Sequence, residues 1–62
     1  MSMTAQKKLD NLIRVKQALF AKYERRAEQA GSKTLRDRLQ RKATHYRRQA
    51  EQFAVQRRQL EG

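Results

Sequence analysis

The chain has 62 residues, of which 16 are Lys or Arg and six are Asp or Glu, so its net charge is +10; it contains no cysteine and no proline. So short a chain forms one small domain with no cleft between lobes, and without cysteine it has neither a disulfide framework nor a thiolate metal site. No apolar run approaches the ~18 residues that cross a membrane, and the first ten residues lack the apolar stretch of a secretory signal. We therefore expect a single domain over residues 1–62, located in the cytoplasm.

The first predicted element is an amphipathic helix over about residues 4–30. At ~100° per residue its apolar side chains fall on one stripe that is ~120° wide. The members of this stripe are Ala5, Leu9, Leu12, Ile13, Leu19, Phe20, Tyr23, Ala27 and Ala30. Val15 widens the stripe further, so that the apolar arc is broader than one partner helix can cover.

A hinge at residues 31–33 follows, and the letters "GSKT" at residues 31–34 invite comparison with a phosphate-binding loop. Ser32 separates Gly31 from Lys33, no second glycine precedes Gly31, and a helical run rather than a strand leads into it, so the P-loop pattern is not met. We interpret Gly31 as a helix end in the left-handed conformation. Ser32 or Thr34 is then the N-cap of the next helix.

The second predicted helix covers about residues 34–61, where Leu39, Tyr46, Phe53 and Leu60 are spaced seven residues apart. A hinge this short forces the two helices to lie antiparallel. The predicted fold is therefore all-α, a two-helix antiparallel hairpin. Pairing the helices outward from Gly31 places three pairs opposite each other: Phe20 with Ala43, Ile13 with Ala50, and Lys16 with Tyr46.

A single hairpin buries little apolar surface for its length, which predicts a homodimer in the form of a four-helix bundle. The expected oligomer interface consists of Leu12, Val15, Lys16 and Leu19. Lys16 is unusual there because it projects into the apolar stripe. Its methylene groups can cover the core while the ammonium reaches water, it can pack over Tyr46, or it can fix the register of the oligomer.

No catalytic or metal-binding set is present in the sequence. His45 is expected to be exposed, and no cysteine or second histidine could complete a zinc site with it. The carboxylates have basic residues three or four positions away, as in surface ion pairs. The expected pairs are Asp10–Arg14, Asp37–Arg41, Arg47–Glu51 and Arg57–Glu61. We expect no enzymatic activity, no cofactor and no small-molecule substrate.

Basic residues are concentrated around the hinge. Between residues 22 and 48 there are ten Lys or Arg and three acids, so this part carries +7 of the net charge. The ten are the candidate nucleic-acid-binding residues: Lys22, Arg25, Arg26, Lys33, Arg36, Arg38, Arg41, Lys42, Arg47 and Arg48. Tyr23 and Tyr46 precede arginines and could stack on bases, but both lie on the apolar stripes, which favours packing between the helices.

These features predict a small, non-enzymatic nucleic-acid-binding hairpin whose Arg-rich hinge end and second helix contact the phosphate backbone. Structured RNA is favoured over DNA, because binding through shape and backbone suits it. The alternative is an interaction or scaffold protein, with the apolar flank docked on partner helices and the charge on an acidic protein. A role at a membrane surface is less consistent, because the apolar residues are needed to close the hairpin.

Overall fold

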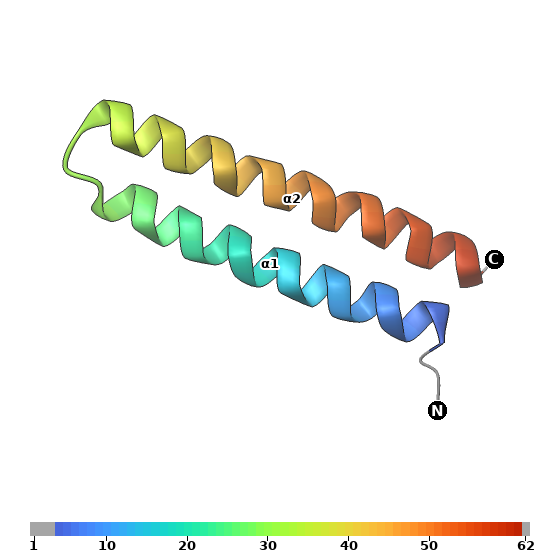
Figure 1. The fold of residues 1–62 in the computed structure, drawn as a ribbon. Coiled ribbons are helices and arrows are strands. Elements are labelled where there is room, and N and C mark those ends of the chain that lie inside the picture. The colour runs from blue at the N-terminus through green and yellow to red at the C-terminus, as the bar shows by residue number, and fades with distance from the viewer. Residues whose placement is uncertain (1–3, 62) are drawn as a thin grey trace.

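The computed structural model describes residues 4–61, which form two helices and no strand. Helix α1 covers Ala5–Gln29 and helix α2 covers Lys33–Glu61. The helices lie side by side in opposite directions, with the hinge at one end and both termini at the other (Figure 1). The prediction of an all-α helical hairpin is confirmed. Helix α2 begins within the segment that the sequence assigns to the hinge.

Each helix begins at a hydroxyl side chain that caps it. The Thr4 hydroxyl accepts a hydrogen bond from the backbone N–H of Lys7 at 3.2 Å, and the Ser32 hydroxyl accepts one from that of Leu35 at 3.2 Å. Such bonds satisfy backbone donors that have no partner within the helix. Of the two residues that the sequence offers as the second cap, Ser32 therefore holds this position, and Thr34 lies inside α2.

The expected left-handed conformation of Gly31 is wrong. Helix α1 ends at Gln29, and its C-cap residue Ala30 is extended, with φ −66° and ψ 134°. No glycine of residues 4–61 has a positive φ. The chain reverses because extended Ala30 turns it out of α1 and Ser32 immediately starts α2, so this turn requires no left-handed residue.

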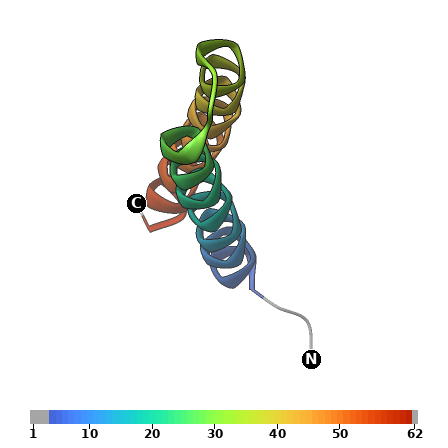
Figure 2. The ribbon, with the colours of Figure 1, turned by 90° about the vertical axis from the view of Figure 1, so that its left-hand side faces the viewer.

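The two helices pack through small residues. Ala27, Ala43 and Ala50 are 2%, 4% and 7% exposed and are the buried apolar residues of residues 4–61. Larger side chains such as Leu9, Ile13 and Phe53 are only half-buried. The Cα atoms span 46 × 23 × 11 Å, so the molecule is a flat slab. A view from the hinge end shows that the helix axes are inclined to each other (Figure 2).

One contact supports the pairing counted outward from the hinge. The Lys16 ammonium lies 5.4 Å from the centre of the Tyr46 ring, as predicted, although the same ring also stacks on Tyr23; the pair of Ile13 with Ala50 stays a prediction. Phe20 lines one surface groove with Ala43 and a second with Ala50. Large side chains on one helix thus lie against small ones on the other, as expected for closely packed helices.

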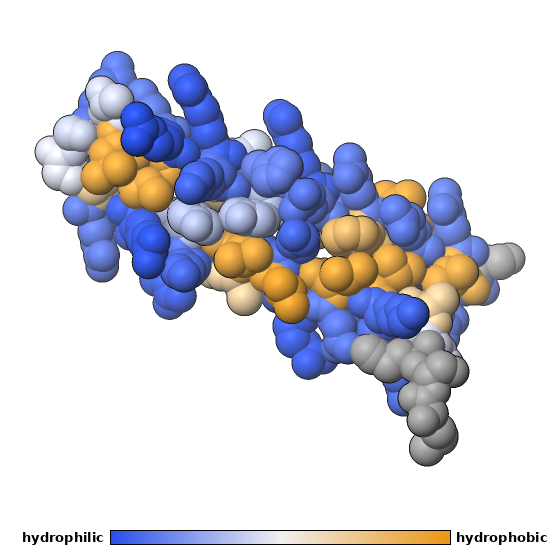
Figure 3. All heavy atoms as spheres, in the orientation of Figure 1, coloured by the Kyte–Doolittle hydropathy of each residue, from blue (hydrophilic) through white to orange (hydrophobic). Residues whose placement is uncertain are grey.

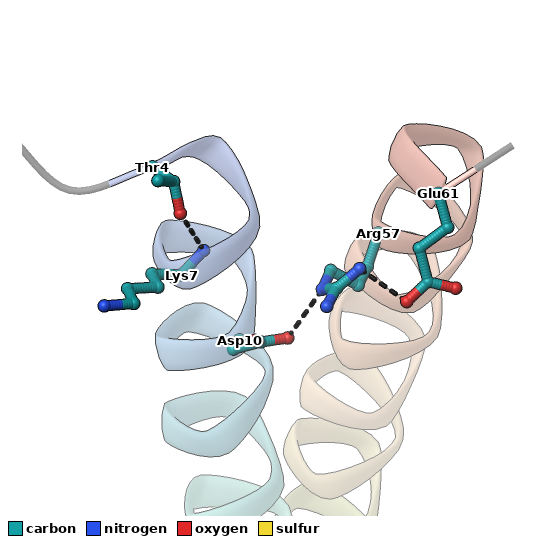
Figure 4. A network of polar contacts seen from close by, with 5 residues as sticks. All are labelled: Thr4, Lys7, Asp10, Arg57 and Glu61. Carbon is teal, nitrogen blue, oxygen red and sulfur yellow. Dashed lines mark hydrogen bonds and ion pairs between the residues drawn. The ribbon is translucent and has the colours of Figure 1, made fainter.

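Near the termini an ion-pair network joins the helices. Arg57 donates from Nε to Asp10 Oδ1 at 3.0 Å and from Nη1 to Glu61 Oε1 at 2.6 Å (Figure 4). The predicted pairs Arg57–Glu61 and Arg47–Glu51 are confirmed, the second at 3.2 Å. The predicted pair Asp10–Arg14 is wrong, because Asp10 reaches across to α2 instead. Among residues 4–61 Asp37 and Arg41 do not come within ion-pair distance either.

Candidate nucleic-acid interface

We call residues 22–48 the hinge half of the hairpin, and residues 4–21 together with 49–61 the open half. All ten candidate cations are exposed and surround the hinge half. Three project from the end of α1: Lys22, Arg25 and Arg26. The other seven project from α2, between its first residue and its middle: Lys33, Arg36, Arg38, Arg41, Lys42, Arg47 and Arg48. The local helical structure holds each cation on a rigid element and spreads the set around both helices.

Three of the ten cations already contact other groups of the chain. The Arg26 guanidinium and the Lys42 ammonium lie 5.8 and 5.4 Å from the centre of the Tyr23 ring. Arg47 pairs with Glu51. The side chains of the other seven have no ion pair or ring contact within residues 4–61. These seven are Lys22, Arg25, Lys33, Arg36, Arg38, Arg41 and Arg48.

Two tyrosines join the helices in the hinge half. The rings of Tyr23 and Tyr46 stack at 5.6 Å with 19° between their planes, and His45 meets Tyr46 edge-on at 5.6 Å. Lys16 lies over Tyr46, and Lys42 lies over Tyr23. Both rings are half-buried. The two ring faces that stack on each other are therefore covered. These tyrosines pack between the helices and do not form an open platform for bases.

The outer face of α2 carries a cationic groove. Gln40, Arg41, Thr44, His45 and Arg48 line this shallow depression, and its lining includes no carboxylate. Spacings of four and seven residues bring these side chains onto one face of the helix. Exposed guanidinium, amide, hydroxyl and imidazole groups all offer N–H or O–H donors to phosphate oxygens.

Gln40 and Thr44 carry no charge, so a search of the sequence for cations does not find them. The sequence suggests only a metal-ligand role for His45. The signal that would have identified them is their spacing: Gln40 and Thr44 alternate with Arg41 and His45 on the same helical face.

The flank of the hinge half around Ala27 and Ala43 has mixed charge. Arg36 and Arg47 line the same groove as Glu24 and Glu28. The carboxylates weaken the attraction of this groove for phosphate. The structure thus places Arg41 and Arg48 in a groove whose lining has no acid and Arg36 and Arg47 in one with two glutamates. Arg48 also lines a smaller groove with Glu51, which is paired with Arg47, and the ten cations are not gathered at one point.

The four residues expected at an oligomer interface lie in the open half. Leu12 and Val15 are exposed, with 40% and 53% of their surface accessible, while Lys16 and Leu19 are half-buried. Lys16 contacts the Tyr46 ring, which is one of the three roles considered for it. A half-buried ammonium over a ring contributes ~0.5–1 kcal/mol.

Comparison with known protein families, with curated proteins and with solved structures finds no match for this chain. Within the described part of the chain, no three His, Asp or Glu side chains converge in a way that could hold a metal ion. Neither helix, over residues 4–61, is long and apolar enough to pass through a membrane.

Proposed function

We propose that the protein is a non-enzymatic nucleic-acid-binding hairpin of the cytoplasm that contacts the phosphate backbone through its hinge half. The observation that carries the proposal is the set of seven exposed cations that have no ion pair or ring contact within residues 4–61. Arg41 and Arg48 are its most favourable members, because they line the groove on the outer side of α2, whose lining contains no carboxylate; Arg38 is exposed one turn before Arg41. A net charge of +7 in so small a volume is costly without an anionic partner.

Binding of this kind is driven by release of the counterions that phosphate groups hold. Arginine suits it because the planar guanidinium donates two hydrogen bonds to one phosphate. Such contacts position a protein on its target without reading bases. We therefore expect structured RNA to be bound by shape and backbone, with duplex DNA also bound. The proposal includes a homodimer, with Leu12, Val15, Lys16 and Leu19 at the interface.

The test replaces Arg38, Arg41 and Arg48 together with Gln. Glutamine is a good helix former, so the hairpin should persist. Fluorescence anisotropy with an RNA hairpin and with a DNA duplex, at several salt concentrations, measures the binding. Loss of three phosphate contacts should lower the slope of log affinity against log salt by about 2–2.7 and weaken binding on the order of 100-fold at physiological salt.

The control variant replaces Lys7, Arg14 and Arg58 with Gln, which removes the same three charges from exposed positions in the open half. We expect its slope to fall by less than about 1. Equal losses in the two variants would show that total charge, and not the hinge half, governs binding. If the parent protein binds neither probe in a salt-dependent manner, the proposed function is wrong and the acidic-protein alternative replaces it.

A further inference from the structure

Exposed apolar side chains gather on one face of the open half. Leu12, Val15 and Leu60 each retain between 40% and 53% of their accessible surface. Leu12 and Leu60, one from each helix, line a shallow groove together with Ala5 and Leu9. Figure 3 shows an apolar band along the seam between the helices toward the termini. The hairpin therefore leaves an apolar surface formed by both of its helices.

Within residues 4–61 the hairpin alone does not bury a large side chain. The buried apolar residues there are three alanines, whereas protein interiors normally enclose Leu, Ile, Val and Phe. A second copy of this chain offers the same apolar face. The broad side of the slab measures 46 by 23 Å between Cα atoms, so an overlap of about half of it covers roughly 500 Å² on each partner, close to the ~1,000 Å² in total that a biological interface needs.

Charge determines which way two copies can meet. The hinge half carries +7 and the open half +3, so a parallel dimer would place two strongly cationic ends together, at a high electrostatic cost. We propose that two copies overlap antiparallel through the apolar face of their open halves, with the two hinge halves projecting at opposite ends. Because each hinge half is a nucleic-acid-binding end under the proposed function, on which this step rests, such a dimer bridges two nucleic-acid segments.

The charges around the apolar face predict how salt affects this assembly. Lys8 lines the groove, and Lys16 is half-buried two helical turns farther along α1, with its ammonium over the Tyr46 ring. The nearby carboxylates of Asp10 and Glu61 are already paired with Arg57. Two copies therefore bring apolar surface and like charges together, and screening of that repulsion strengthens the dimer. Dimerisation should rise with salt, whereas nucleic-acid binding should fall.

The arrangement is testable by a distance between the two hinges. The chain has no cysteine, and a Cβ atom at Gly31 would meet nothing within 4 Å, so the Gly31→Cys variant accepts one spin label or dye per copy. In the proposed dimer the labels lie farther apart than the 46 Å length of one hairpin. A parallel dimer would bring them within ~20 Å, about twice the spacing of packed helices. Such a short distance would overturn the proposal.

The interface is tested by Leu12→Glu, with Ala18→Glu as the control. Both positions are exposed on α1 and both variants change the charge equally, but Leu12 lines the apolar groove, whereas Ala18 lies about 120° farther round the helix and faces away from α2. In sedimentation experiments Leu12→Glu should raise the dimer dissociation constant more than about tenfold, since a charge would be buried, and keep the parent's helicity. Ala18→Glu should leave it within about twofold. A parent that is monomeric at every concentration and salt would overturn the inference.

Bridging is measured with two RNA hairpins, one immobilised on beads and the other carrying a dye in solution. With RNA in excess over protein, the parent and Ala18→Glu should retain the dye-labelled RNA on the beads. Leu12→Glu should bind each RNA with nearly the parent's salt slope and retain none. Equal retention with Leu12→Glu would overturn bridging by the dimer. If no RNA binds at all, bridging fails together with the proposed function, but the hinge distance still decides the antiparallel arrangement.

Discussion

The hinge half and the open half of the hairpin are closed by different means. In the hinge half Ala27 and Ala43 are almost fully buried, and the rings of Tyr23 and Tyr46 stack between the helices. In the open half one alanine, Ala50, is buried and the ion pair of Asp10 with Arg57 joins the helices, while large aliphatic side chains are left half-exposed.

The two halves therefore present different groups to solvent. Small alanines and stacked rings let the helices of the hinge half approach closely, and its arginines other than Arg26 and Arg47 make no ion pair or ring contact within residues 4–61. The open half adds an ion pair between its helices and leaves apolar surface uncovered. One end of the molecule therefore offers cations and the other offers apolar contact, which suits two different kinds of partner.

The change with the largest expected effect breaks the close packing of the hinge half. Ala43→Leu inserts three extra carbon atoms where the parent residue is 4% exposed, and overpacking of this kind costs about 1–3 kcal/mol. Leucine is also a good helix former, so a loss of stability would reflect packing between the helices. Thermal denaturation followed by circular dichroism measures it.

The matched control is Ala18→Leu, at an exposed position of α1. Its melting temperature should stay close to that of the parent. If Ala43→Leu melts at the same temperature as Ala18→Leu, then the hinge half is not tightly packed, and the contrast between the halves does not hold.

A smaller effect is expected from the ion pair that closes the open half. Arg57 is 24% exposed in its side chain and donates to both Asp10 and Glu61. Such a partly exposed pair contributes up to about 1 kcal/mol after solvent screening. Arg57→Gln should lower the free energy of unfolding by that amount, measured by urea denaturation.

Salt separates this ion-pair effect from a packing effect. The difference between Arg57→Gln and the parent should shrink in high salt, because screening weakens the parent's ion pair. The neighbouring Arg58 is exposed and has no ion pair within residues 4–61, so Arg58→Gln should change stability little. A loss with Arg57→Gln that is equal at low and high salt would mean that its methylene groups, not its charge, hold the helices.

The fold was predictable because it depends on short-range patterns. Helical periodicity, the seven-residue series in the second helix and the short hinge together leave few arrangements other than a hairpin. The pairing of Lys16 with Tyr46 also follows from counting outward from Gly31. Exposure of the ten candidate cations is the ordinary outcome for charged residues on a polar helical face.

What the sequence does not reveal depends on contacts between distant residues. Asp10 has Arg14 one helical turn away, yet it pairs with Arg57, which the fold brings close. The stacking of Tyr23 on Tyr46 depends on the relative rotation of the two helices, and helical periodicity gives only the facing stripe. Likewise, Arg36 and Arg41 carry the same charge, and the sequence does not distinguish their surroundings. Only the packed structure shows that one lines a groove with glutamates and the other a groove without them.

The smallest expected effect concerns the hinge that connects the two halves. Gly31 does not have a positive φ, and a Cβ atom there would meet nothing within 4 Å. Gly31→Ala should therefore be accepted without strain. Alanine also restricts the unfolded chain more than glycine does, which stabilises the folded state by about 0.4–1 kcal/mol. The melting temperature should rise slightly, with unchanged helicity.

The sign of this change distinguishes the observed hinge from the left-handed turn that the sequence suggests. In a left-handed turn Ala would be strained and Gly31→Ala would destabilise the hairpin, by roughly 1–2 kcal/mol. Asn tolerates that conformation better than Ala, so Gly31→Asn would then be the more stable of the two variants. In the hinge described here Gly31→Ala is the more stable of the two variants, because Ser32 already caps α2 and extended Ala30 ends α1. An Asn variant more stable than the Ala variant would therefore contradict this hinge geometry, and comparison of the two melting curves measures it directly.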